Sequence, residues 1–314
     1  MARAPLRLAA VSVDLDEVDC YAAIHGTHLP PDASPHAIYE HALPRFERLF
    51  AEEGIAATFF AVGRDAERPE GAAALARLHA AGHEVGNHSW RHPYDLTRLP
   101  ATQRAEQVDR GAAAIEAACG QAPRGFRAPG YTVDDDLLDL LASRGYRYDS
   151  SVFPCPPYYL AKAAAMGLMR LSGRRSRSVL DDPRVLAAPA DPYRVGRPYW
   201  RRGTGLLELP VAVARTPLGR VPVIGTSVVL AGARGARWLV RSVVGRPLVN
   251  LELHGIDLAD AEADGLQWLR PHQPDLRRPL HAKLAALRAA IAALREAGYS
   301  FVTLSEAADA FASA

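Results

Sequence analysis

Short apolar runs alternate with longer amphipathic segments along most of the chain. Continuous apolar runs are typical of strands buried on both faces of a parallel sheet, whereas apolar residues three and four apart indicate helices. Glycine follows most of the amphipathic segments, as expected at helix ends. This repeated strand–helix–strand pattern predicts an α/β fold. The predicted strands cover 8–13, 57–63, 83–86, 146–149, 206–211, 249–254 and 301–304, with a strand end and turn at 125–131, and the predicted helices cover 35–53, 70–81, 101–119, 133–144, 158–171 and 280–297, before a short terminal helix.

The regular pattern is interrupted between residues 154 and 205. Pro, Tyr and Arg accumulate there, and an apolar helix is followed by Arg174, Arg175 and Arg177. The favoured interpretation is a lid helix packed on its own domain, with a solvated arginine loop. The alternative is a basic amphipathic segment near a membrane surface or a lipid-linked substrate. We therefore expect one domain over 1–314 with an insertion at about 154–205.

Size and composition narrow the functional classes. The 314 residues are 49% hydrophobic and 23% charged, as in folded globular proteins, and the net charge of +2 gives no reason to expect a nucleic-acid partner. The three cysteines are far apart and form no CxxC pair, so neither a disulfide framework nor a thiolate zinc site is expected. No apolar stretch is long enough for a transmembrane segment, and residues 1–7 leave no room for a cleavable signal. These features predict a cytoplasmic protein, with membrane association left open.

Polar residues of compatible chemistry follow several of the predicted strands. They are Asp14, Asp16, His88, His92, Arg127, Asp149 and His254. The carboxyl ends of parallel strands meet at one edge of an α/β barrel, where active sites lie. One carboxylate with two imidazoles suits a divalent metal that keeps open positions. Zinc is the favoured metal, and cobalt, nickel or manganese would fit the same ligands.

The histidine pair lies in the stretch from Asn87 to Pro93. Two histidines four residues apart can reach a common point on one helix face or across a tight loop. The loop is favoured because Pro93 disfavours the right-handed helical region at His92 and Gly86–Asn87 is prone to turn. Taken alone, such a pair is weak evidence for a metal site. The two aspartates strengthen it, because residues two apart in a strand point the same way.

The order of these motifs resembles the polysaccharide deacetylase family, the NodB-homology or carbohydrate esterase family 4 enzymes. The matching segments are Ser12-Val13-Asp14-Leu15-Asp16, His88-Ser89-Trp90-Arg91-His92-Pro93, Arg127-Ala128-Pro129-Gly130-Tyr131, Tyr148-Asp149-Ser150-Ser151 and Leu251-Glu252-Leu253-His254. The resemblance covers roughly residues 8–304 outside the insertion. The branch of the family that is most similar is the exopolysaccharide-locus branch, on the basis of residues 145–154 and the strand Glu208-Leu209-Pro210. It implies a distorted (β/α) barrel with fewer than eight complete units. It also implies a metal-dependent hydrolase that removes an N-acetyl group from an amino sugar or glycoconjugate, acting on a non-peptide carbon–nitrogen bond.

The resemblance implies a role for each motif residue. Asp14 matches the catalytic base, His254 the general acid, and Arg127 the arginine that orients the base. The residues that match the metal ligands are Asp16, His88 and His92. This assignment agrees with the chemistry expected of the residues themselves, because amide hydrolysis needs a base for water and an acid for the leaving amine.

Substrate contacts are expected at the same edge of the barrel. A backbone N–H near Gly130 or Tyr131 could help to hold the oxyanion. Trp90 and Tyr131 could form walls on which a sugar stacks, although an aromatic residue beside a site is as often plain packing.

Departures from the family pattern leave some roles open. The first motif reads Asp-Leu-Asp-Glu in place of the commoner adjacent Asp-Asp-Gly, so Glu17 could act as a further ligand. The segment after His254 lacks a common proline, and Asp257 could orient a site histidine or cap the following turn. Asp149 could orient His254 or hold a neighbouring loop, and the second role is favoured.

Two other functions fit the same residues. One is a deformylase or deacylase of a lipid-linked amino sugar. It is suggested by the N-terminal sequence, which predicts a cytoplasmic protein, and by the basic, apolar insertion. The other is a non-catalytic carbohydrate-binding protein on the same scaffold. The binding protein is disfavoured because it would need neither a base nor an acid.

Overall fold

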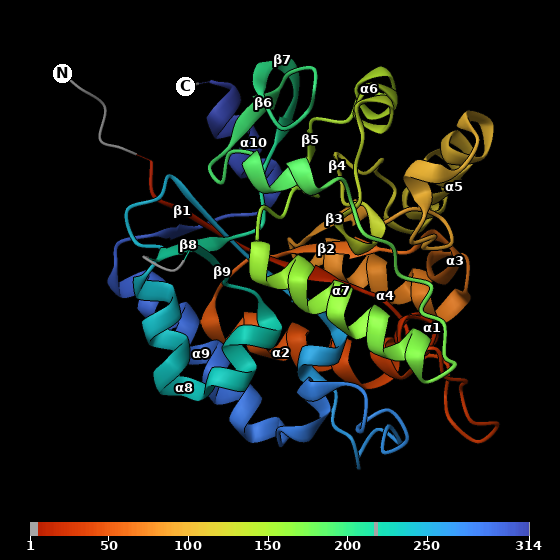
Figure 1. Ribbon diagram of the computed structural model, residues 1–314. Coiled ribbons are helices and arrows are strands. Elements are labelled where there is room, and N and C mark those ends of the chain that lie inside the picture. Colours follow the sequence, from red (N-terminus) through yellow and green to blue (C-terminus); the bar gives the residue numbers. More distant parts are fainter. Residues whose placement is uncertain (1–5, 217–218, 314) are drawn as a thin grey trace.

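The computed structural model describes residues 6–216 and 219–313, and a curled sheet with helices packed around it forms its centre (Figure 1). The strands of this sheet are β1 Leu8–Asp14, β2 Thr58–Ala61, β3 Glu84–Asn87, β4 Gly125–Phe126, β5 Tyr148–Asp149, β6 Tyr193–Val195, β7 Arg202–Glu208, β10 Leu248–His254 and β11 Ser300–Phe301. Within the described ranges it has nine strands in the order β10-β1-β2-β3-β4-β5-β7-β6, with β11 beside β1. All neighbours are parallel except β6 and β7. A separate antiparallel pair is formed by β8 Val213–Thr216 and β9 Gly219–Pro222.

The helices lie between the strands in sequence and cover the sheet. They are α1 Val18–His25, α2 Leu43–Glu53, α3 Gly63–Ala66, α4 Pro69–Ala80, α5 Ala101–Cys119, α6 Asp135–Ser143, α7 Pro156–Leu171, α8 Gly225–Arg241, α9 Leu280–Glu296 and α10 Leu304–Ala312. Their ends follow the expected signals. Gly54 ends α2 in the left-handed region (φ 62°), and the Asp134 carboxylate accepts the Leu137 N–H at the start of α6. Asp134 therefore caps the N-terminus of α6.

The sheet curls into a distorted barrel. The chain that follows β7 returns towards β10, because the N–H of Ala212 donates to the carbonyl of Asn250 at 3.0 Å. Successive residues of β1 face opposite sides. Ala9, Val11 and Val13 pack in the large apolar cluster beneath α2 and α9, whereas Ala10 packs with α10. Ser12 and Asp14 share the side of Ala10, so β1 carries polar residues into the barrel at its carboxyl end.

Three helices are absent from the sequence-based prediction. They are α1, α3 and α8, which lie in segments where no helix is expected. Gly232, with φ 66°, places a kink inside α8. The first strand ends at Asp14, so Asp16 lies on the following loop and not in the strand.

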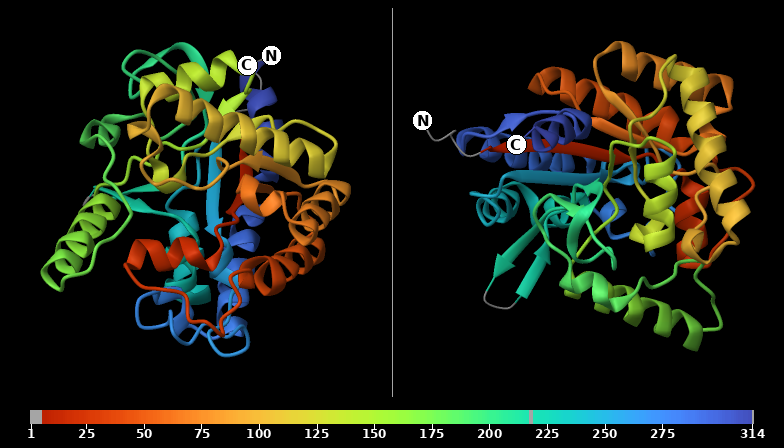
Figure 2. Two further views of the ribbon diagram at one scale, coloured as in Figure 1. Left: turned by 90° about the vertical axis from the view of Figure 1, so that its right-hand side faces the viewer. Right: turned by 90° about the horizontal axis from the view of Figure 1, so that it is seen from above.

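The insertion contributes both to the sheet and to the surface. Its β6 pairs with β7, whereas α7 has no buried residue and lies at the margin of the molecule in both views of Figure 2. Residues 1–5, on which part of the expectation about a leader rests, lie outside the described ranges. In the described part of the chain, no helix has the length and apolar character needed to cross a membrane.

Candidate active site

Asp16, His88 and His92 come together after β1 and β3. Asp16 Oδ1 lies 3.3 Å from His88 Nε2 and 3.1 Å from His92 Nε2, and all three side chains are buried. Among the described residues, Asp16 Oδ1 and both ring nitrogens of His92 have no hydrogen-bond partner. Buried polar atoms without partners are costly, and a divalent cation would satisfy them. One carboxylate and two imidazoles fit zinc or a related metal.

The loop that carries the histidines has an unusual backbone. His88 and His92 lie outside helices, as expected, and His92 has φ 55°. In the described chain, the non-glycine residues with positive φ are Ser89, His92 and Tyr131. Such conformations cost free energy and gather at functional sites. Here the turn is supported by the Ser89 hydroxyl, which accepts the His92 N–H at 3.1 Å.

His88 is oriented by the neighbouring strand. Its Nδ1 lies 2.7 Å from the carbonyl oxygen of Arg127, so Nδ1 carries the proton and donates it. The lone pair of Nε2 therefore faces Asp16, which is the tautomer that a metal needs. Burial opposes the charge of Asp16, but His92 and His88 hold the pKa of its carboxyl well below its usual range.

Arg127 fixes Asp14 inside the barrel. Its guanidinium is fully buried and donates to Asp14 Oδ1 at 2.7 Å, to the carbonyl of Ser150 at 2.8 Å, and to the hydroxyls of Ser12 and Ser150. It also lies over the Phe60 ring at 4.3 Å. The second oxygen, Asp14 Oδ2, points towards the histidines and lies 3.8 Å from His88 Nε2. Arg127 thus positions a carboxylate beside the three potential metal ligands.

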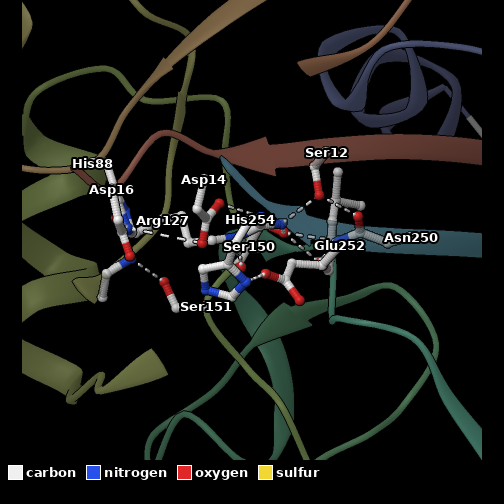
Figure 3. Close-up of polar contacts among 12 residues, drawn as sticks. Ser12, Asp14, Asp16, His88, Arg127, Ser150, Ser151, Asn250, Glu252 and His254 are labelled. Carbon is white, nitrogen blue, oxygen red and sulfur yellow. Dashed lines mark hydrogen bonds and ion pairs between the residues drawn. The ribbon is translucent and has the colours of Figure 1, made fainter. Parts of the chain in front are cut away.

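The register of β1 and β10 places His254 beside Asp14. Asp14 pairs with His254 and Ser12 with Glu252 along these parallel strands. Glu252 is buried, and its Oε1 lies 2.8 Å from His254 Nδ1 (Figure 3). Burial disfavours a charged imidazole, but Glu252 raises the pKa of His254 well above its usual range. Glu252 therefore favours the protonated form of His254.

Glu252 is a site residue for which the sequence-based interpretation gave no role. The available signal was its spacing, because residues two apart on one strand face the same side. Asp149 does not take this place. Its carboxylate accepts the N–H and hydroxyl of Ser151, which in turn accepts the Ala128 N–H at 2.8 Å. Asp149 thus holds the loop beneath Arg127, as favoured from the sequence.

Glu17 and Asp257, whose roles the sequence left open, also accept backbone N–H groups. Glu17 accepts the N–H groups of Ile38 and Tyr39, and burial raises the pKa of Glu17 to about 8. Asp257 accepts the backbone N–H of His254 at 2.8 Å, so it caps the turn after β10 and holds the histidine by its main chain.

A cavity of about 200 Å³ lies over these residues. Asp14, Asp16, His88 and His254 form its floor, and its walls include Gly130, Tyr131, Tyr158 and Lys162. Lys162, on α7, donates to the Gly130 carbonyl at 3.3 Å, and burial lowers the pKa of its ammonium to about 8. The insertion therefore supplies part of the cavity wall.

Trp90 does not belong to this cavity. Its ring lies between the guanidiniums of Arg91 and Arg110, at 3.8 and 3.2 Å, and its indole N–H donates to Glu67. Because Trp90 is buried and does not line the cavity, the structure does not support the stacking role expected for it. The N–H of Tyr131 is also engaged, because it donates to the Ala128 carbonyl.

Comparison with known proteins points to one family. Residues 32–148 match the family model described as polysaccharide deacetylase. A peptidoglycan deacetylase of Helicobacter pylori (strain ATCC 700392 / 26695) is 29% identical over 157 residues, covering 49% of this chain and 53% of that protein. A chitooligosaccharide deacetylase of Sinorhizobium fredii (strain NBRC 101917 / NGR234) is 35% identical over 120 residues, covering 38% of this chain and 53% of that protein. The chain thus spans about half the length of these curated relatives.

Solved structures share the fold. A Mycobacterium smegmatis protein assigned to the polysaccharide deacetylases matches 98% of this chain and 93% of its own, with a TM-score of 0.56 and 20% identity. A mutant of the Bacillus anthracis carbohydrate esterase family 4 pseudoenzyme BA3943, with restored enzymatic activity, matches 98% of this chain and 71% of its own, with a TM-score of 0.50 and 16% identity. At such identities the likeness shows the fold alone, and it confirms the predicted distorted (β/α) barrel of the NodB-homology type.

The motifs and the comparisons therefore agree on the family. The narrower assignment to the exopolysaccharide-locus branch stays a prediction. The model of the polysaccharide deacetylase family matches residues 32–148 of this chain, and the curated proteins to which part of the chain is similar include a peptidoglycan deacetylase and a chitooligosaccharide deacetylase.

Proposed function

We propose that the protein is a metal-dependent hydrolase that removes the N-acetyl group of an amino sugar or glycoconjugate. The observation that carries this proposal is the content of one cavity. Asp14 and His254 line this cavity together with potential metal ligands. Arg127 holds Asp14, and Glu252 is paired with His254. A base, an acid and a metal site are the groups that hydrolysis of an amide requires.

Each residue has a separate task in this proposal. Asp16, His88 and His92 would hold the metal, which when bound polarises the amide carbonyl and activates water. Asp14 takes the proton of the attacking water through the oxygen that Arg127 leaves free. His254 then gives its proton to the nitrogen of the leaving amine, which would otherwise be a poor leaving group. Of the two proposed oxyanion donors, the N–H of Tyr131 is engaged by the Ala128 carbonyl, so the N–H of Gly130 is the remaining candidate.

The acyl group released from a panel of N-acyl amino sugars tests this function. We expect acetate release that stops when a chelator is added and returns with zinc, cobalt, nickel or manganese. Formate as the main product would favour the deformylase. No acid released from any substrate by fully metal-loaded protein would contradict the hydrolase and favour a carbohydrate-binding protein, a real alternative because a pseudoenzyme shares this fold.

Glu252→Gln is expected to move the alkaline limb of the pH profile of kcat/KM to lower pH. Protonated His254 is the working acid, so activity falls as pH rises through its pKa. Glu252 raises that pKa, and removing its charge lets the fall begin at lower pH. Glu262→Gln, on the exposed surface, is the matched control and should leave the profile unchanged. Identical profiles for wild type and Glu252→Gln would remove His254 from the role of acid.

A further inference from the structure

A second, larger cavity adjoins the candidate active site. It has a volume of about 930 Å³ and lies between the outer part of α7 and the segment 173–180. Ser178 lines both cavities, so the two are neighbours. A cavity of this size is large enough for a multi-atom group, such as a substituent of the substrate.

The walls of this cavity are basic. Its lining includes five arginines, namely Arg98, Arg170, Arg174, Arg175 and Arg177, and no acidic residue. Across residues 6–216 and 219–313, none of these guanidiniums forms an ion pair with a carboxylate. Arg174 and Arg98 donate to the carbonyls of His25 and Leu180, which orients them but does not neutralise them. The positive charge in this cavity is therefore uncompensated.

A row of residues on α7 connects this charge to the reacting groups. Lys162 lines the catalytic cavity, and Met166 and Arg170 line the basic one. These positions are four residues apart, so they lie on one helix face, and Lys162 and Arg170 are separated by about 12 Å along the axis at roughly 1.5 Å per residue. A substrate whose amide lies over Asp14 and His254 could thus extend past Lys162 into the arginines.

We propose that the basic cavity binds a phosphate or diphosphate group carried by the same molecule as the amide, so that the substrate is a phosphorylated glycoconjugate. Arginine binds phosphate oxygens through paired N–H donors, and several arginines without a counter-acid favour a group with more than one negative charge. This inference rests on the proposed function for the identity of the reacting bond. The binding of phosphate in the basic cavity can be measured whether or not the proposed function is correct.

The test compares four probes with wild-type protein and with the double variant Arg170→Gln/Arg175→Gln. The probes are N,N′-diacetylchitobiose, N-acetylglucosamine 1-phosphate, UDP-N-acetylglucosamine and a hyaluronan tetrasaccharide, which carry no charge, phosphate, diphosphate and carboxylates respectively. Binding is measured by calorimetry on chelator-treated protein, and acetate release on metal-loaded protein. Arg48→Gln on α2, an exposed arginine outside both cavities, is the matched control.

We expect the two phosphorylated probes to bind more tightly than the uncharged one, and the double variant to lose roughly tenfold or more of that affinity. The uncharged probe and the control variant should show no change. Tight, arginine-dependent binding of the phosphorylated probes without acetate release would support this inference while contradicting the proposed function. Equal affinity for charged and uncharged probes, a preference for the carboxylate probe, or no effect of the double variant would overturn the inference, whether or not acetate is released.

Discussion

His92→Ala is expected to remove the bound metal and to lower acetate release by roughly a thousandfold or more, because water and the amide carbonyl then lose their activation. His92 Nε2 faces Asp16 Oδ1 at 3.1 Å and has no hydrogen-bond partner in the described chain, so its removal deletes a proposed ligand without breaking a hydrogen bond. Elemental analysis of the purified protein, together with the rate of acetate release, checks this result.

His281→Ala is the matched control for the loss of an imidazole. His281 is exposed on α9, far along the chain from the ligand loop, and its variant should keep both the metal and the activity. Circular dichroism should show that His92→Ala is folded. A folded His92→Ala protein that keeps stoichiometric metal and full turnover would refute the role of His92 as a ligand.

Asp14→Asn is expected to keep the metal but to lose turnover by roughly a hundredfold to ten-thousandfold, the range for removal of a general base. An amide has the shape of the carboxylate but cannot take the proton of water. Asp14 is not one of the three proposed ligands, so metal content should match that of the wild type. Metal content and kcat measured on the same preparation separate the two roles.

The same substitution also bears on stability. Asn leaves the buried Arg127 guanidinium without its carboxylate, and breaking a buried ion pair costs roughly 3–5 kcal/mol. Ser12→Ala is the matched control, because it removes a hydrogen bond from Arg127 without changing the charge. It should retain most of the turnover. Loss of the metal in folded Asp14→Asn would instead make Asp14 a ligand.

Much of the fold could be predicted because local signals coincide with the elements. The apolar run before Asp14 becomes β1, the segment 101–119 becomes α5, and the motif residues lie where parallel strands end. α8 was not predicted, although its residues are amphipathic, because glycines inside a segment, such as Gly232, favour a break in a helix. The curl of the sheet likewise depends on long-range pairing that no local pattern encodes.

The residues of the site were easier to predict than the ion pairs and contacts between them. The sequence shows that Asp14, Arg127 and His254 are present, but the ion pair between Asp14 and Arg127 joins residues 113 positions apart. The pairing of His254 with Glu252 depends on which face of β10 points into the barrel. Trp90 shows the opposite error, because its place beside His88 in sequence gave no sign of the two arginines that cover its faces.

Anomalous scattering from crystals of the zinc-loaded protein tests the metal assignment most directly. A single strong peak is expected at about 2.0–2.2 Å from an Asp16 carboxylate oxygen and from Nε2 of both His88 and His92. The described residues offer one other group of potential ligands, formed by Asp14, Glu252 and His254. A peak between those three residues, or no peak in a crystal of active protein, would contradict a metal-dependent hydrolase built on Asp16, His88 and His92.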